Sequence, residues 1–119
     1  MDEAMLGNSG VRVSRLALGL AFRGQHDERV MEATIHRALD RGISFFDCAN
    51  DYGRTPTDPY GGPAERALGR SIAGQRDEVV VTTKVGFDTG PGPNDSGGSR
   101  LHIMREIERS LGRLATDHV

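Results

Sequence analysis

The chain has 119 residues, enough for one domain, and 15 basic residues against 17 acidic ones give a formal net charge of −2. This balance argues against a protein whose main partner is a polyanion such as nucleic acid. No run approaches the roughly 18 apolar residues of a membrane span, and residues 1–4 are acidic where a secretory signal would be basic. The single cysteine, Cys48, excludes an internal disulfide framework. We therefore expect a cytoplasmic protein without a nucleic-acid or membrane partner.

The first third of the chain predicts a hairpin, a strand and a helix. Residues 5–13 place two short extended segments around a Gly-Asn-Ser-Gly turn. Residues 16–20 form a short apolar run that is typical of a buried strand. Asp27 is a suitable N-cap, and the apolar residues that follow it recur with a helical period until Gly42.

The next segments predict another strand, helix and strand. Residues 43–46 indicate a strand that ends at Asp47, and Pro63 suits the first turn of a short helix. Residues 79–83 are β-branched at every position, which predicts a strand buried on both faces, as a central parallel strand is. This strand leads directly into Lys84.

A third helix is predicted after a loop rich in glycine and proline, with Ser99 as its N-cap. Four apolar residues share one face of this helix: Ile103, Ile107, Leu111 and Leu114. The charged residues between them predict its solvated side: Arg105, Glu106, Glu108, Arg109 and Arg113.

The alternation of strands and helices predicts βαβ units with a parallel sheet. A doubly wound dinucleotide-binding fold would carry G-x-G-x-x-G after the first strand, but Gly19 and Gly24 have the wrong spacing. No Walker lysine follows Gly97 and Gly98 either. We therefore expect an α/β fold, a partial (β/α)8 TIM barrel with roughly the first three βα units after an N-terminal β-hairpin. The active site of such a barrel lies at the carboxyl ends of its strands.

Of the 15 lysine and arginine residues, Lys84 is the only lysine. An isolated lysine can be an ordinary surface residue, but this one ends a predicted buried strand. An ammonium is a compact charge whose protonation can be tuned, whereas a guanidinium stays protonated. Asp47 ends the preceding strand, so both side chains point to one barrel mouth, where buried charges are expected to pair.

Tyr52 follows Asp47 by five residues, in the loop after that strand. A phenol normally titrates near pH 10, too high for an efficient proton donor at neutral pH. A cation within about 4–6 Å stabilises a phenolate and makes a phenol a stronger acid. Asp47, Tyr52 and Lys84 therefore predict an acid that can protonate a carbonyl oxygen while a hydride arrives at the carbon.

The motifs around these residues resemble those of the aldo/keto reductase family, and the likeness covers essentially the whole chain. They are Leu6-Gly7-x-Ser9-Gly10, Phe46-Asp47-x-Ala49-x-x-Tyr52-Gly53, Thr83-Lys84-Val85 and Ser110-Leu111-x-Arg113-Leu114-x-Thr116-Asp117. Residues 92–100 are most similar to microbial members of the aldehyde and aryl-alcohol reductase type. The resemblance implies that Tyr52 is the catalytic acid, that Lys84 strengthens it, and that Asp47 pairs with Lys84.

The resemblance also implies a cofactor, NADPH, bound across the barrel mouth, a small carbonyl compound as substrate, and no metal. Gly19, Leu20 and Ala21 match the first-strand segment that lies against the nicotinamide ring, with Asp47 beside it. Many members have a threonine at the position of Leu20, so that segment keeps only backbone or packing contacts here.

The family's catalytic histidine follows the fourth strand, which residues 117–119 only enter. Neither His102 nor His118 occupies the matching place. A complete barrel takes about 250 residues. We therefore expect residues 1–119 to be the N-terminal portion of one NADP-dependent oxidoreductase barrel domain, truncated at the start of strand 4, inactive and weakly folded by itself.

Two other functions fit the same residues. A lone lysine at a barrel mouth is also what a Schiff-base aldolase uses, which would make Lys84 a nucleophile. A non-catalytic nucleotide-binding subunit on the same fold, like the channel β-subunits of this family, is the other alternative. The leading hypothesis is NADPH-dependent reduction of aldehydes or ketones, with Tyr52 as general acid.

Overall fold

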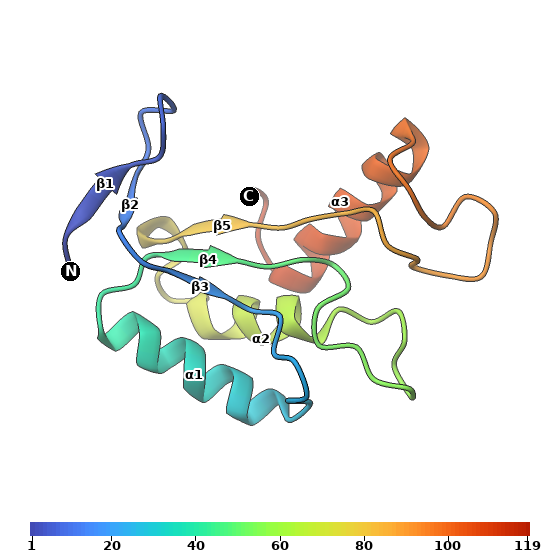
Figure 1. Ribbon diagram of the computed structural model, residues 1–119, viewed down its shortest axis with the longest axis horizontal. Coiled ribbons are helices and arrows are strands. Elements are labelled where there is room, and N and C mark those ends of the chain that lie inside the picture. Colours follow the sequence, from blue (N-terminus) through green and yellow to red (C-terminus); the bar gives the residue numbers. More distant parts are fainter.

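The computed structural model describes all residues, 1–119, as a small hairpin and a parallel sheet with three helices (Figure 1). The hairpin pairs β1 (Glu3–Met5) antiparallel with β2 (Arg12–Ser14). The sheet has the order β3 (Ala17–Gly19), β4 (Phe45–Asp47) and β5 (Val80–Thr82), all parallel. The helices are α1 (Glu28–Asp40), α2 (Pro63–Ile72) and α3 (Arg100–Leu114), and a 3-10 turn at Arg76–Glu78 precedes β5. The predicted hairpin and the three βα units are confirmed, and the sheet is open rather than closed into a barrel.

The helices begin where the sequence signals predict. Asp27 Oδ1 accepts a hydrogen bond from the Arg29 backbone N–H at 2.9 Å, which caps α1. Pro63 occupies the first turn of α2. Ser99 Oγ accepts from the His102 backbone N–H at 3.1 Å, which caps α3. These local contacts fix where each helix starts relative to the loop before it.

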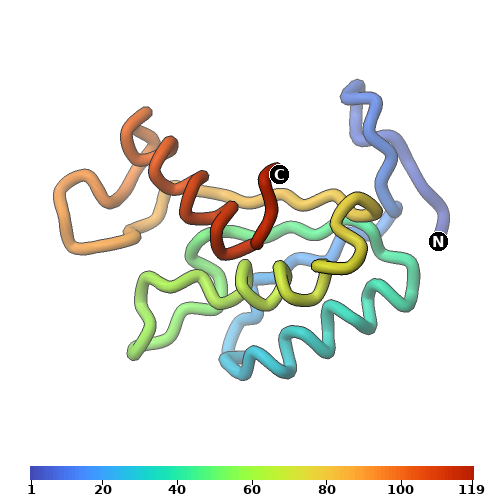
Figure 2. The backbone as a smooth tube through the Cα atoms, turned by 180° about the vertical axis from the view of Figure 1, so that it is seen from behind, coloured from blue at the N-terminus to red at the C-terminus, as the bar shows by residue number.

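The hydrophobic core lies between the parallel sheet and the helices. Helix α2 packs against both α1 and α3, while the hairpin stands at one end of the sheet and α3 at the other (Figures 1 and 2). The largest fully buried apolar side chains come from all of these layers: Leu20, Met31, Ile35, Phe46, Leu68, Ile72 and Leu114. None of the helices combines the length and the hydrophobicity that crossing a membrane requires.

Strand β5 lies at the edge of this sheet, with β4 at its centre. Val81 is buried against the core, but Val80 and Thr82 are only half-buried. The prediction that residues 79–83 form a central strand buried on both faces is therefore wrong for this chain. The reason is that β5 pairs on one side only, so the residues on its outer face remain partly accessible.

Helix α3 turns a different face to the core than its apolar pattern predicts. Its buried residues are spaced four apart: His102, Glu106, Ser110 and Leu114. Ile103 is exposed, and Ile107 and Leu111 are half-buried. The placement of Glu106 and Arg113 on the solvated side is therefore wrong. Both side chains find hydrogen-bond partners on neighbouring segments, which offsets the cost of removing their charges from water.

The contact between α2 and α3 depends on a glycine. A Cβ atom on Gly69 would lie 2.5 Å from the Leu114 carbonyl oxygen, whereas one on Gly112 would meet only open space. We expect Gly69→Ala to lower the free energy of unfolding by about 1–3 kcal/mol through overpacking. Gly112→Ala, the matched control in the neighbouring helix, should raise it by about 0.5–1 kcal/mol. Urea unfolding followed by circular dichroism measures both; equal effects would contradict this packing.

Candidate active site

The register of the sheet brings Asp47 and Lys84 to the same place, the carboxyl end of the parallel strands. Asp47 pairs with Thr82 in the ladder between β4 and β5. The pairing continues past both strands, since the Cys48 N–H donates to the Thr82 carbonyl at 2.8 Å and the Asn50 N–H donates to the Lys84 carbonyl at 3.1 Å. All three parallel strands point in the direction of this end of the sheet, where the loops of residues 48–62 and 86–98 lie (Figure 1). The two segments that carry Asp47 and Lys84 are therefore fixed to each other through their backbones.

Lys84 links Asp47 to Tyr52. Its Nζ donates to both Asp47 carboxylate oxygens at 2.7 Å and to the Cys48 carbonyl at 2.9 Å. The Tyr52 hydroxyl oxygen lies 3.4 Å from Nζ, and the centre of the Tyr52 ring lies 5.0 Å from it. The structure thus places the three side chains next to one another, within the separation at which a cation affects a phenol. Their catalytic roles stay predictions.

The ion pair between Asp47 and Lys84 stabilises the charged form of each group. Partial burial raises the pKa of Asp47, but hydrogen bonds from Lys84 and Thr82 and the charge of Lys84 outweigh it, so the pKa is lowered overall. Partial burial lowers the pKa of Lys84, but its hydrogen bonds to Asp47 and Tyr52 outweigh that effect and raise the pKa overall. Lys84 is therefore an ammonium at neutral pH.

Tyr52 is anchored by its backbone and opens onto a hollow. Its N–H donates to the Ala49 carbonyl and its carbonyl accepts from the Ala64 N–H, both at 3.2 Å, which ties it to the start of α2. A hollow of about 380 Å³ lies beside it, and the lining includes Ala21, Phe22, Arg23, His26, Asp51 and Arg54. A small molecule in this hollow would contact Tyr52.

Of the three residues at the end of β3, Gly19, Leu20 and Ala21, two leave room for a planar ring. Gly19 pairs with Asp47 in the ladder and is exposed, and a Cβ atom added there would meet nothing within 4 Å. Ala21 is half-buried and lines the hollow beside Tyr52. Leu20 is 0% exposed and belongs to the core, while its N–H donates to the Asp47 carbonyl at 2.9 Å. Gly19 and Ala21 can therefore face a nicotinamide ring, but the side chain of Leu20 cannot.

Two buried carboxylates beneath the site were missed by the sequence reasoning. Glu65 on α2, 0% exposed, accepts hydrogen bonds from Thr83 Oγ1 and Arg113 Nε, each at 2.6 Å. Glu106 on α3, 1% exposed, accepts from Asn50 Nδ2 at 3.0 Å. The spacing of these residues along their helices could have predicted that they are buried. Glu65 shares a face with Leu68 and Ile72, and Glu106 shares one with Ser110 and Leu114.

The side chains of Cys48, His102 and His118 form no hydrogen bond with the side chains of Asp47, Tyr52 or Lys84. Cys48 is fully buried, and burial raises the pKa of its thiol, as expected for a packed side chain. His102 is buried on α3 and His118 pairs with Asp117 at 2.7 Å, so neither contacts Tyr52 or Lys84 through a hydrogen bond. No three metal-binding side chains lie close enough together to hold a metal ion.

Comparison with known proteins identifies the family. Residues 15–119 match the sequence model of the aldo/keto reductase family. The chain belongs to this family.

Its relatives are much longer proteins. This aldo/keto reductase chain is 39% identical to the L-glyceraldehyde 3-phosphate reductase of Escherichia coli (strain K12), a match that covers 100% of the chain and 35% of that protein. It is 41% identical to a protein of Oryza sativa subsp. japonica named probable voltage-gated potassium channel subunit beta, again over 100% of the chain and 35% of the relative. The chain therefore spans about a third of these curated relatives.

A solved structure supports the same assignment. The holo form of an aldo-keto reductase from Bacillus halodurans superposes with a TM-score of 0.84 at 28% identity, covering 100% of this chain and 38% of that one. The open three-stranded sheet is therefore similar to part of a larger aldo/keto reductase structure.

The ion pair makes the stability of the chain depend on pH. Because the folded pKa of Asp47 lies below its unfolded value of about 3.9, its contribution is complete above that value and is lost as pH falls through the folded pKa. We expect the difference in free energy of unfolding between wild type and Asp47→Asn to shrink on acidification. Urea unfolding at a series of pH values measures it. A constant difference across the series would contradict the ion pair, and Glu108→Gln, at an exposed position, is the control.

Proposed function

We propose that the protein to which this chain belongs reduces aldehydes or ketones to alcohols, with NADPH as hydride donor and Tyr52 as general acid. The observation that carries the proposal is the contact of the Tyr52 hydroxyl with a lysine ammonium that Asp47 holds on both of its oxygens. The family assignment and the reductase named for the Escherichia coli relative support it.

The direction of the hydrogen bonds suits a proton donor. Lys84 Nζ donates to the Tyr52 oxygen at 3.4 Å, so the phenol hydrogen is free to point away from Lys84 to the carbonyl oxygen of a substrate. As that hydrogen leaves, negative charge develops on the phenol oxygen, and the nearby ammonium stabilises it. Asp47 prevents the ammonium from turning away into water. Positioned proton transfer of this kind contributes about 10²–10⁴ in rate.

NADPH, when bound, supplies a hydride to the carbonyl carbon. Gly19 and Ala21 are the residues of this chain that would hold its nicotinamide ring, next to Asp47 at the end of the sheet. The backbone of both residues and the Ala21 methyl group would orient the ring through packing rather than through hydrogen bonds.

The charge around the hollow favours a substrate with a negative group. Arg23 and Arg54 line it and neither forms an ion pair, against one lining carboxylate, Asp51. L-Glyceraldehyde 3-phosphate, named for the Escherichia coli relative, is an aldehyde of this kind. We therefore include a phosphorylated and an unphosphorylated aldehyde among the substrates to be compared.

The alternatives suit the geometry less well. A Schiff-base lysine must be a neutral amine to attack a carbonyl, whereas Asp47 keeps Lys84 charged and raises its pKa. A non-catalytic nucleotide-binding subunit has no need of a phenol held against an ammonium.

The decisive variant is Tyr52→Phe, because it removes only the hydroxyl. Since the chain spans about a third of its relatives, turnover is measured in the full natural polypeptide that contains it, as loss of NADPH absorbance with small aldehydes. We expect Tyr52→Phe to lower kcat by about 10²–10⁴. Tyr60→Phe, the only other tyrosine of the chain and exposed, is the matched control and should keep wild-type turnover. Wild-type turnover in Tyr52→Phe, or borohydride trapping of substrate on Lys84, would contradict the proposal.

A further inference from the structure

We propose that Glu106 is a positioning residue for Tyr52. Its carboxylate, buried on α3, holds the segment that carries the phenol in register with Lys84. The inference rests on the proposed function, since it concerns how the acid of that reaction is placed.

The contact runs through Asn50. The Asn50 side chain donates from Nδ2 to Glu106 Oε2 at 3.0 Å, and its backbone N–H donates to the Lys84 carbonyl at 3.1 Å. Asn50 is buried and lies two residues before Tyr52. One residue is thus fixed on one side to the lysine segment and on the other to α3. A change at either contact would move Tyr52 relative to the ammonium.

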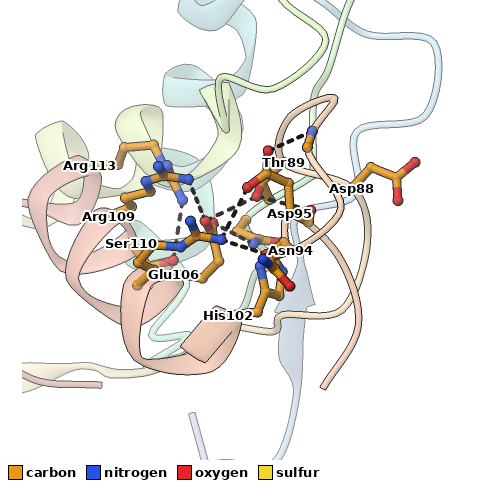
Figure 3. Close-up of polar contacts among 12 residues, drawn as sticks. Asp88, Thr89, Asn94, Asp95, His102, Glu106, Arg109, Ser110 and Arg113 are labelled. Carbon is orange, nitrogen blue, oxygen red and sulfur yellow. Dashed lines mark hydrogen bonds and ion pairs between the residues drawn. The ribbon is translucent and has the colours of Figure 1, made fainter. Parts of the chain in front are cut away.

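Glu106 also holds the loop that follows Lys84. Its Oε1 accepts from Thr89 Oγ1 at 3.0 Å and from Arg109 at 2.7 Å, and Figure 3 shows Thr89 and Arg109 directed at the carboxylate from the loop and from α3. With Asn50, three donors from three segments converge on one side chain. With Asn50 donating from Nδ2, both oxygens of the side chain at position 106 must accept, which a carboxylate provides and an amide does not.

The contacts of Glu106 stabilise its ionised form. Burial raises the pKa of Glu106, but hydrogen bonds from Asn50, Thr89 and Arg109 outweigh burial and lower it overall. Hydrogen bonds to a charged acceptor are about twice as strong as those between neutral groups. The Asn50 contact is therefore a stronger restraint on the Tyr52 segment than a contact between two neutral amides would be.

The helix offers a matched pair of variants for the test. Glu106→Gln turns an amide toward the three donors, whereas Glu108→Gln makes the same chemical change two residues away at an exposed position. In the full natural polypeptide, we expect Glu106→Gln to lower kcat about tenfold through displacement of the phenol, with little change in KM. A fall in kcat at unchanged KM separates displacement of the phenol from a loss of substrate binding. Glu108→Gln should leave kcat and KM at wild-type values.

A charge swap tests the contact itself. Asn50→Asp alone places two carboxylates face to face and should lose more activity than Glu106→Gln. In the double variant Asn50→Asp with Glu106→Gln, the new glutamine donates to the new aspartate, so we expect kcat to recover above that of either single variant. Additive losses in the double variant would overturn direct coupling between the two residues.

The outcomes separate positioning from a merely structural role. If Glu106→Gln lowers only the melting temperature, and the folded protein keeps the wild-type kcat and KM, the positioning proposal fails. If it does not fold, Asn50→Ala cuts the same hydrogen bond while Glu106 keeps Thr89 and Arg109; wild-type kcat in that variant would equally overturn the proposal. A Tyr52→Phe variant with full turnover would instead refute the proposed function.

Discussion

A lysine that follows the last residue of a strand in a small sheet would ordinarily place its ammonium in water, where it would stabilise no particular neighbour. The Lys84 side chain is half-exposed, yet its Nζ is held, because Asp47 binds it through both carboxylate oxygens and the Cys48 carbonyl accepts a further hydrogen bond. The charge is therefore held in one place, 3.4 Å from the Tyr52 oxygen. Any chemistry assigned to the phenol depends on this restraint, since electrostatic stabilisation of a phenolate decreases with distance from the cation.

The fold provides the restraint in two layers. The upper layer is the parallel ladder, which fixes the end of β4 against the end of β5 and extends past both strands through Cys48 and Asn50. The lower layer consists of Glu65 and Glu106, which reach from α2 and α3 to the residues next to the site, Thr83 and Asn50. Arg113 and Arg109 balance these buried charges. Helix positions are thereby coupled to the separation of the groups on the strands.

Local signals in the sequence predicted much of this arrangement. Asp27, Pro63 and Ser99 marked the helix starts because each supplies or tolerates the geometry of a first turn, whatever the rest of the chain does. The alternation of strands and helices implied a parallel sheet, and a parallel sheet gathers the residues that end its strands. The closeness of Asp47, Tyr52 and Lys84 could thus be predicted from the sequence alone.

The predictions that were wrong have a common cause, because each depends on a contact with a segment that is distant in the sequence. Glu106 was placed on a solvated face because its charge is expensive to bury alone, yet Asn50 and Thr89 come from loops whose paths the helical pattern does not contain. The apolar run at residues 79–83 predicted a central strand, whereas the number of strands that pair with β5 is a property of the whole sheet.

Turnover of a Lys84→Met variant tests the central electrostatic claim most directly. Replacing Lys84 by methionine removes the ammonium and preserves much of the side chain's length. In the full natural polypeptide, loss of NADPH absorbance with a small aldehyde measures kcat. Because the ammonium lies 3.4 Å from the oxygen on which negative charge develops, we expect kcat to fall by about 10²–10³. A wild-type kcat in Lys84→Met would show that the ammonium does not act on the phenol.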